Sequence, residues 1–467
     1  MEELAFATLT ELAAGLRKRA YTSVELTRLF LDRIARLDTK AHAYVAVYEE
    51  SALRQAQAAD LQRQSGLPCQ PLHGLPIALK DICEIAGRVT TAGSAAWSDR
   101  VTAVTCTVVE HLLAAGMIVL GKNHMVEFCF GGWGVNPLMG TPRNPWDWNG
   151  PHRVPGGSSS GSAVAVAAGL APAAIGSDTG GSVRMPASFN GLTGLKPTHG
   201  RISLYGTLPF VPTLDSLGPL TRTAEDAALI VNALAGFDAR DPATCDGLNI
   251  LADAMADESI RHFRVAVMRQ DQYPWPVTDD VQHAIDNAVE VFRSLGCRIE
   301  YSDIPLDFEE MTRDQGLISA AEAYHVHAAY IENAGLPFGP TVRKRILKGR
   351  SIDAMSYLTA LTHRQSSIIR FNEWMQSRDL LLTPTLPFTA CALEDVDEES
   401  MSVLAFVRSV SYVGGCAISL PSGFSTDGLP IGMQLIAKPW QEHLLLQAGR
   451  AFQDVTDWHR RTPPDVR

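Results

Sequence analysis

One stretch in the middle of the chain, residues 130–218, constrains the fold more than any other part. It is rich in Gly, Ser, Pro and Thr and carries few long charged side chains. Such a composition is typical of a linker or a disordered segment, but small apolar residues at 163–174 interrupt it. Glycines permit positive φ angles and let one backbone segment approach another closely. We therefore predict that residues 130–218 form a tightly packed centre.

The segments on either side of this centre alternate between helical and strand patterns. Thr22 and Glu25 have the spacing of a helix-capping box, and an apolar stripe at helical spacing follows them. Residues 75–79 predict a buried strand that leads into Lys80, and residues 318–334 predict a helix. Alternation of this kind favours an α/β fold, with a central mixed, twisted β-sheet covered by helices on both faces.

The length of 467 residues is more than one hydrophobic core usually serves, which on its own favours two or three domains. Large α/β enzymes, however, often build one continuous sheet of this size. We expect a single domain over residues 1–467, made of a helical N-terminal region (1–70), a core that carries the chemistry (71–225) and a C-terminal part (226–467). The last part would complete the sheet and the substrate pocket.

Charge and composition exclude several classes of function. The formal net charge is −11, so the surface repels phosphate backbones and nucleic acid is not an expected partner. Hydrophobic residues make up 46% and charged residues 19%, as in a compact globular protein. No apolar run reaches membrane-spanning length, so no membrane association is expected, and residues 1–9 lack the features of a secretory signal. The eight cysteines show no zinc spacing, so we expect a cytoplasmic enzyme with reduced thiols and no metal.

Two Gly/Ser loops carry the residues best suited to chemistry. The first loop reads Gly156-Gly157-Ser158-Ser159-Ser160-Gly161-Ser162-Ala163, and the second reads Gly176-Ser177-Asp178-Thr179-Gly180-Gly181-Ser182-Val183-Arg184-Met185-Pro186-Ala187. Glycines let amide N–H groups converge on one point and hold an anion, which in acyl transfer is the oxygen of the tetrahedral intermediate. Ser182 ends a Thr-Gly-Gly turn of this kind, so we interpret it as a nucleophile that attacks a carbonyl.

A serine nucleophile needs a base, and histidine is the usual one. Around these loops the sequence offers only His152 and His199. Lys80 is the alternative, because the apolar strand before it would carry its amine into the interior. Burial lowers the pKa of an amine, since the charged form loses its hydration. A desolvated lysine is therefore the predicted base.

Together the two loops resemble the signature of the amidase signature family, without a gap from residue 156 to residue 187 and with the same spacing between Ser158 and Ser182. Further segments are similar to that family, at residues 74–81, 121–128, 382–385, 417–421 and 428–434. The resemblance spans roughly residues 26–463. It implies the amidase-signature fold and a hydrolase that cleaves linear amides through an acyl-enzyme.

The resemblance also implies a role for individual residues. Ser182 is the nucleophile, Ser158 is a bridging serine held on a cis peptide bond, and Lys80 is the general base and later the general acid. The backbone N–H groups of the oxyanion hole would come from Thr179, Gly180, Gly181 and Ser182. Two buried charges, Asp178 and Arg184, would orient the loop rather than react. Water hydrolyses the acyl-enzyme, and no metal or cofactor is implied.

Other interpretations of the same residues compete with this one. Residues 157–161 also fit the shorter motif G-x-S-x-G, which in an α/β-hydrolase would make Ser159 the nucleophile. The residues before it, 153–156, do not make a convincing strand, which disfavours that fold. A non-catalytic binding module is disfavoured because Lys80, Ser158 and Ser182 are all present.

The catalytic subunit of glutamyl-tRNA(Gln) amidotransferase, which releases ammonia from glutamine for a partner subunit, has the same signature. It commonly has Gln where Met185 stands here, and a longer tail, and we take both departures to disfavour it. Two further departures from the family pattern are Ser160, where Gly is frequent, and Cys416, where Pro is frequent. The sequence does not determine whether either change alters the geometry of the loop or of the pocket.

The sequence determines the substrate least. Phe128 and Trp133, with Phe130 and Met139 nearby, are candidates for lining a pocket for apolar or aryl acyl groups, and Cys416 is a further candidate. The substrate is expected to be a small molecule, but an amide, a carbamate and an ester all suit the chemistry. The sequence does not determine the oligomeric state, for which a homodimer is the default.

Overall fold

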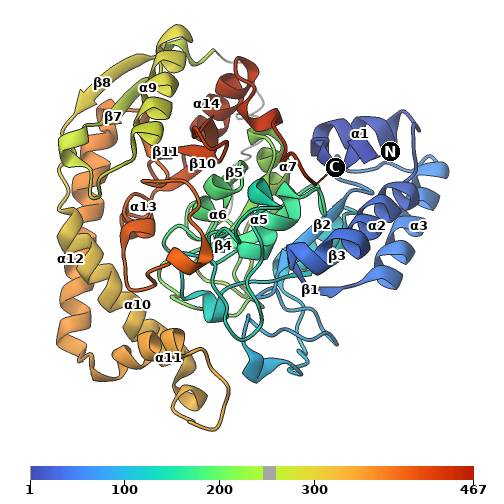
Figure 1. Cartoon of the computed structure of the whole chain (residues 1–467), viewed down its shortest axis with the longest axis horizontal. Helices are drawn as coiled ribbons and strands as arrows, with labels where there is room; N and C mark the ends of the chain where they lie inside the picture. Colours follow the sequence, from blue (N-terminus) through green and yellow to red (C-terminus); the bar gives the residue numbers. More distant parts are fainter. Residues whose placement is uncertain (1, 246–258, 467) are drawn as a thin grey trace.

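A computed structural model describes residues 2–245 and 259–466 of the chain. One sheet of 11 strands runs through the molecule, in the order β1-β3-β2-β4-β6-β5-β10-β11-β9-β7-β8 (Figure 1). In chain order the strands are β1 (Tyr44–Val47), β2 (Pro76–Lys80), β3 (Ile118–Asn123), β4 (Ala174–Asp178), β5 (Thr193–Lys196), β6 (Ser216–Thr221), β7 (Arg264–Met268), β8 (Arg298–Ser302), β9 (Leu380–Pro384), β10 (Cys416–Phe424) and β11 (Pro430–Ala437).

Helices of very different lengths surround this sheet. The α-helices are α1 (Leu9–Arg17), α2 (Ser23–Ala41), α3 (Glu49–Gln64), α4 (Thr107–Ala114), α5 (Ser160–Ala167), α6 (Arg184–Phe189), α7 (Ala224–Leu234), α9 (Asp279–Ser294), α10 (Phe308–Ile331), α11 (Pro340–Leu347), α12 (Ala354–Trp374), α13 (Arg408–Tyr412) and α14 (Glu442–Asp454). Figure 1 shows α1–α3 at one end of the sheet and α10–α12 at the other. None of the helices in the described ranges is both long and apolar enough to cross a membrane.

The sheet is mixed. Strand β2 runs parallel to β3 and β4, and β7 runs parallel to β8 and β9, while the central pairs from β4 to β11 are antiparallel. Successive side chains of a strand point to opposite faces, and β10 shows what covers each face. Ser419 faces α6, and Leu420 packs against Gly449 of α14. The predicted α/β fold, with helices on both faces of a mixed sheet, is confirmed.

Local patterns in the sequence account for several elements. Thr22 caps α2, and Glu25 closes the capping box by accepting from the Thr22 backbone. The predicted buried strand is β2, every residue of which is buried. The predicted helix at 318–334 is α10, but α10 begins at Phe308, because the Asp307 carboxylate caps it by accepting from Glu310 N.

The Gly- and Ser-rich centre is tightly packed, as predicted. Helix α5 is buried at every position. An ideal Cβ built on Gly161 would lie 2.4 Å from the Ala43 carbonyl oxygen and 2.6 Å from His124 N, so no larger residue fits there. The two Gly/Ser loops therefore sit at the ends of a rigid unit formed by α5 and β4.

Candidate active site

Parallel pairing brings Lys80 and the second Gly/Ser loop to the same edge of the sheet. Lys80 is the last residue of β2, and Asp178 is the last residue of β4, which pairs with β2 in parallel. The carboxyl ends of parallel neighbours meet at one edge, where open α/β sheets commonly bind ligands. The second Gly/Ser loop continues from Asp178 and reaches Ser182 at this edge.

The Lys80 amine is fully buried among serine hydroxyls. Its Nζ donates to Ser158 Oγ at 2.6 Å and to Ser177 Oγ at 2.8 Å. Burial lowers the pKa of Lys80 below its ordinary value, because the charged ammonium loses its hydration. A neutral amine at this position can accept a proton from Ser158.

Backbone contacts hold Ser158 in place. The peptide bond between Gly157 and Ser158 is cis, and the Ser158 side chain is fully buried. The Ser158 carbonyl accepts from Val126 N at 3.1 Å. The next residue, Ser159, donates its N–H to the Ser182 carbonyl at 3.3 Å, which ties the two Gly/Ser loops together.

Ser182 lies at the wall of a cavity of about 260 Å³. Ser182 is 7% exposed, whereas Ser158 is not exposed at all. The cavity is smaller than the roughly 300–1,000 Å³ that holds drug-sized ligands. Of Ser182, Ser158 and Lys80, Ser182 lines the cavity and the other two do not, so Ser182 is the one that a small substrate in the cavity would meet.

The loop that carries Ser182 presents backbone N–H groups, but not all of them are free. The Gly181 N–H donates to Asp178 Oδ1 at 2.7 Å, which differs from its expected place in an oxyanion hole. Within the described ranges, the N–H groups of Gly180 and Ser182 donate no hydrogen bond. These two, with Thr179 beside them, are the N–H groups left for an oxyanion.

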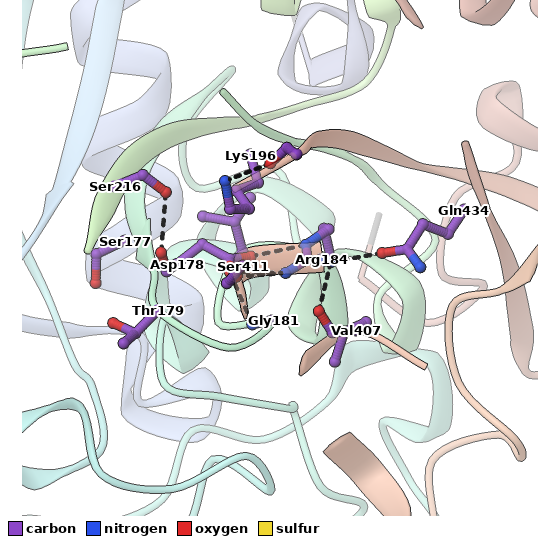
Figure 2. Close-up of polar contacts among 12 residues, drawn as sticks. Ser177, Asp178, Thr179, Gly181, Arg184, Lys196, Ser216, Val407, Ser411 and Gln434 are labelled. Carbon is purple, nitrogen blue, oxygen red and sulfur yellow. Dashed lines mark hydrogen bonds and ion pairs between the residues drawn. The ribbon is translucent and has the colours of Figure 1, made fainter. Parts of the chain in front are cut away.

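Asp178 and Arg184 form a fully buried ion pair beneath this loop (Figure 2). Arg184 donates to Asp178 from Nε at 3.0 Å and from Nη2 at 2.9 Å, which is a bidentate contact. Its Nη1 donates to the Val407 carbonyl at 2.9 Å and to Gln434 Oε1 at 2.6 Å. The pair therefore connects the Ser182 loop to β11 and to the segment before α13.

Burial by itself would raise the pKa of Asp178, but Arg184 outweighs it. The Arg184 guanidinium, the charge of Lys196 and the Gly181 N–H together lower the pKa of Asp178 to about 2. Asp178 is thus ionised and fully hydrogen-bonded, and it has no proton to exchange near neutral pH. This placement fits the expected orienting role of Asp178 and Arg184.

Ser177 and Asp215 are two neighbours of the site to which the sequence analysis assigned no role. Ser177 is the second acceptor for Lys80, and Asp215 accepts from the Thr179 hydroxyl. Burial raises the pKa of Asp215 to about 6. Ser177 stands inside the quoted second loop, so its place on β4 could have been a signal. Asp215 stands just before β6, and only the pairing of β6 with β4 brings it close.

The residues proposed for substrate binding are not all together. Trp133 lines the cavity and stacks on Phe388 with ring centroids 5.6 Å apart. Phe128 does not line the cavity, and its ring lies against that of His327 with the ring centroids 4.4 Å apart. Cys416 is buried on β10, with its thiol 3.2 Å from the Lys438 carbonyl oxygen, and it does not line the cavity either.

Other residues weighed from the sequence have distinct environments. Phe130 and Met185 line the cavity, whereas Met139 does not. Ser159 Oγ accepts from Ser177 N at 3.2 Å and donates to the Ser177 carbonyl at 3.3 Å, so it binds backbone and does not face the cavity as a nucleophile would. Ser160 Oγ is buried without a hydrogen-bond partner in the part of the chain that the structure describes.

A family model and several known proteins match nearly the whole length of this chain. The sequence model of the Amidase family matches residues 25–446. A glutamyl-tRNA(Gln) amidotransferase subunit from Ralstonia nicotianae is 39% identical, over 98% of this chain and 99% of that protein. The Thermotoga maritima structure of the same subunit is 31% identical, with a TM-score of 0.81 over 97% of this chain and 95% of that one. A peptide amidase from Stenotrophomonas maltophilia is 27% identical, with a TM-score of 0.85 over the full length of both chains.

Proposed function

Because this chain belongs to the amidase signature family, we propose that it hydrolyses a small carboxamide through an acyl-enzyme on Ser182. The observation that carries the proposal is the buried Lys80 amine, 2.6 Å from Ser158 Oγ, behind a nucleophile loop that opens on a small cavity. Desolvation supplies a neutral base, and none of the described residues that line the cavity is a histidine. The two free N–H groups of Gly180 and Ser182 supply donors for the oxyanion.

The proposed reaction moves protons along a single path. Neutral Lys80 takes a proton from Ser158 while Ser158 takes one from Ser182, and Ser182 Oγ forms a bond to the amide carbonyl carbon. The carbonyl becomes an oxyanion, and its collapse breaks the C–N bond as the same path returns a proton to the leaving nitrogen. Water then attacks the acyl-enzyme with its proton taken by the relay, which releases the carboxylic acid and restores Ser182.

The physiological setting that the relatives favour is ammonia release from glutamine, as the catalytic component of an amidotransferase-type complex with protein partners. The longer tail expected of such subunits does not separate these relatives from this chain, because alignments cover 99% and 98% of the relatives' own lengths. Met185 remains a difference from the common pattern of those relatives, and its side chain lines the cavity.

A stand-alone amidase for apolar or aryl amides, with ester or carbamate side activity, is the second candidate. The apolar part of the cavity wall, which includes Phe130, Trp133 and Met185, favours it. The two candidates differ in one measurement. The purified chain would release ammonia from glutamine only after partner subunits are added in the first case, and would hydrolyse simple amides alone in the second.

The acyl-enzyme itself can be tested without knowing the substrate. Treatment with a fluorophosphonate followed by peptide mass spectrometry should place one adduct on Ser182, and Ser182→Ala should remove it. A matched control is Ser411→Ala, which replaces a buried serine that contacts Arg184 rather than the cavity. An adduct on Ser159, or no adduct in the folded protein, would reject the proposed nucleophile.

A further inference from the structure

Arg408, the first residue of α13, is a cation in the cavity wall that lacks an anionic partner. In the described part of the chain, its guanidinium donates no hydrogen bond and forms no ion pair, whereas the other guanidinium in the wall, that of Arg345, is occupied. Arg345 Nη1 donates to the Phe130 carbonyl at 2.9 Å and lies 3.9 Å from Glu398 Oε2. A desolvated charge is costly unless it is paired, so an anionic ligand in the cavity would stabilise Arg408.

The surroundings of Arg408 supply no charge to neutralise it. Burial and the positive charge of Arg345 lower the pKa of Arg408 to about 10, so it is still protonated near neutral pH. The wall contains two carboxylates, but Glu398 faces Arg345 and Glu399 binds Lys344 at 3.0 Å. Although the whole chain carries a net charge of −11, this cavity presents an uncompensated positive charge.

Arg408 is held at a fixed place relative to the nucleophile. The preceding carbonyl, that of Val407, accepts from Arg184, which also binds the Ser182 loop through Asp178. An ideal Cβ built on Gly180 would lie 3.7 Å from Arg408 Cγ, which places the stem of Arg408 against the Thr-Gly-Gly turn. A group bound by Arg408 would therefore lie a short distance from the reacting carbonyl.

A second unpaired polar group supports a polar ligand in the same cavity. Gln315 on α10 is 1% exposed and lines the cavity. Its Nε2 donates to the Thr179 carbonyl at 3.3 Å, which fixes the orientation of the amide. Its Oε1 has no hydrogen-bond partner among the described residues and can accept an N–H from a ligand.

From these observations we propose that Arg408 binds a carboxylate on the acyl part of the substrate, so that the enzyme selects acidic carboxamides over neutral ones. The substrate class is the half-amide of a short dicarboxylic acid, including the ω-amide of an acidic amino acid. A guanidinium matches a carboxylate in a bidentate geometry that neither a methyl group nor an aryl ring can satisfy. This inference rests on the proposed amide hydrolysis and refines its substrate.

The test compares acidic amides with neutral amides of equal chain length. Ammonia release from malonamate, succinamate, glutaramate and glutamine is measured beside that from propanamide, butanamide and pentanamide. Hydrogen bonds to charged groups predict a kcat/KM for the best acidic amide roughly 10- to 100-fold above its neutral counterpart. In Arg408→Met this ratio should fall to near one, and Arg408→Lys should give an intermediate ratio.

Arg350→Met is the matched control, because Arg350 follows the wall residue Lys348 by two positions but is 67% exposed and lies 3.5 Å from Glu332. Arg350→Met should keep the wild-type ratio.

A second experiment applies if thermal melting shows that Arg408→Met is not folded. Ser182→Ala is then titrated calorimetrically with glutaramate and with pentanamide, and only glutaramate should bind. Equal kcat/KM for acidic and neutral amides, or an unchanged ratio in Arg408→Met, would overturn the role of Arg408. Absence of turnover with every amide, both for the chain alone and after partner subunits are added, would instead count against the proposed function.

Discussion

The Lys80 amine lies 2.6 Å from the Ser158 hydroxyl, and neither side chain is exposed to solvent. The two residues come from the end of β2 and from the loop before α5, so the contact depends on how these segments pack around the sheet. Charged amines are costly to bury, and no carboxylate binds Lys80 directly in the described ranges. The contact therefore suits a base that is neutral at rest.

Replacing Lys80 with Met should abolish turnover but leave thermal melting nearly unchanged. The variant loses its base, which predicts a fall in kcat of at least about 10²- to 10⁴-fold. It also loses the cost of burying an amine, which offsets the lost hydrogen bonds to the two serines. Steady-state kinetics and a melting curve on the same preparation check both expectations. Retained activity would reject the lysine base.

Lys196→Met is the contrasting variant for this experiment. Lys196 is also a buried lysine, but its Nζ donates to the carbonyls of Pro197 and Gly415, at 2.8 and 2.9 Å. Removing it leaves two buried carbonyls unpaired, so melting should fall while the folded fraction keeps its kcat. The two lysines should thus separate catalysis from stability.

The pH profile of kcat/KM on a neutral amide should fall on the acid side. The active form of Lys80 is neutral, and burial lowers its pKa below 10.5. Activity is therefore present above the folded pKa of Lys80 and is lost as the pH falls through it. Because the unfolded lysine keeps the higher pKa, the unfolded state binds more protons between the two values, so stability rises with pH there. A profile with no acid limb would contradict the assignment.

Local sequence patterns were sufficient for part of the fold. The capping box at Thr22, the buried strand before Lys80 and the alternation of helices and strands all follow from short-range periodicity. The order of the strands does not, because β4 pairs with β2 and β6, and β10 lies between β5 and β11. Pairings between distant segments depend on the three-dimensional packing, which no periodicity of one segment encodes.

The same distinction applies to the site. The two loops could be predicted because their Gly and Ser residues are clustered, and Lys80 could be predicted because an apolar strand leads into it. The cavity wall could not, since Gln315 and Arg408 come from α10 and α13 and look like ordinary helical residues in the sequence. Phe128 shows the converse. Its position in the sequence suggested the pocket, but its ring packs against His327 and does not line the cavity.

Asp178→Asn should lower the free energy of unfolding more than the substitution of any exposed carboxylate does. It leaves the fully buried Arg184 without its partner, which typically costs about 3–5 kcal/mol. Asp271→Asn is the matched control, because Asp271 pairs with Arg269 at 2.6 Å but is 63% exposed. This variant should leave the midpoint of chemical denaturation unchanged. Chemical denaturation of both variants gives the comparison, and equal midpoints would contradict the role of the pair.

The pH dependence of stability provides an independent check on Asp178. Its pKa is lowered to about 2 in the folded state, against about 3.9 for a free aspartate. The folded state therefore holds its stabilising charge above pH 4 and loses it as the pH falls from about 4 to 2. Asp178→Asn should flatten this part of the stability profile.

Gly181→Ala tests whether the nucleophile loop tolerates any side chain. Gly181 has φ of 119°, and an ideal Cβ there would lie 2.3 Å from Val407 Cγ2, so the loop must move. Since Ser182 follows directly, we expect kcat to fall at least about 100-fold, in line with losing one oxyanion donor.

Gly428→Ala controls for backbone strain. The φ of Gly428, 77°, is also left-handed, but no atom lies within 4 Å of an ideal Cβ built there. It should cost about 1–2 kcal/mol of stability and leave kcat unchanged. The clash predicts that adding Val407→Ala to Gly181→Ala restores part of kcat, as a double-mutant cycle would measure. If both glycine variants lost the same kcat, strain alone and not the contact with Val407 would explain the effect.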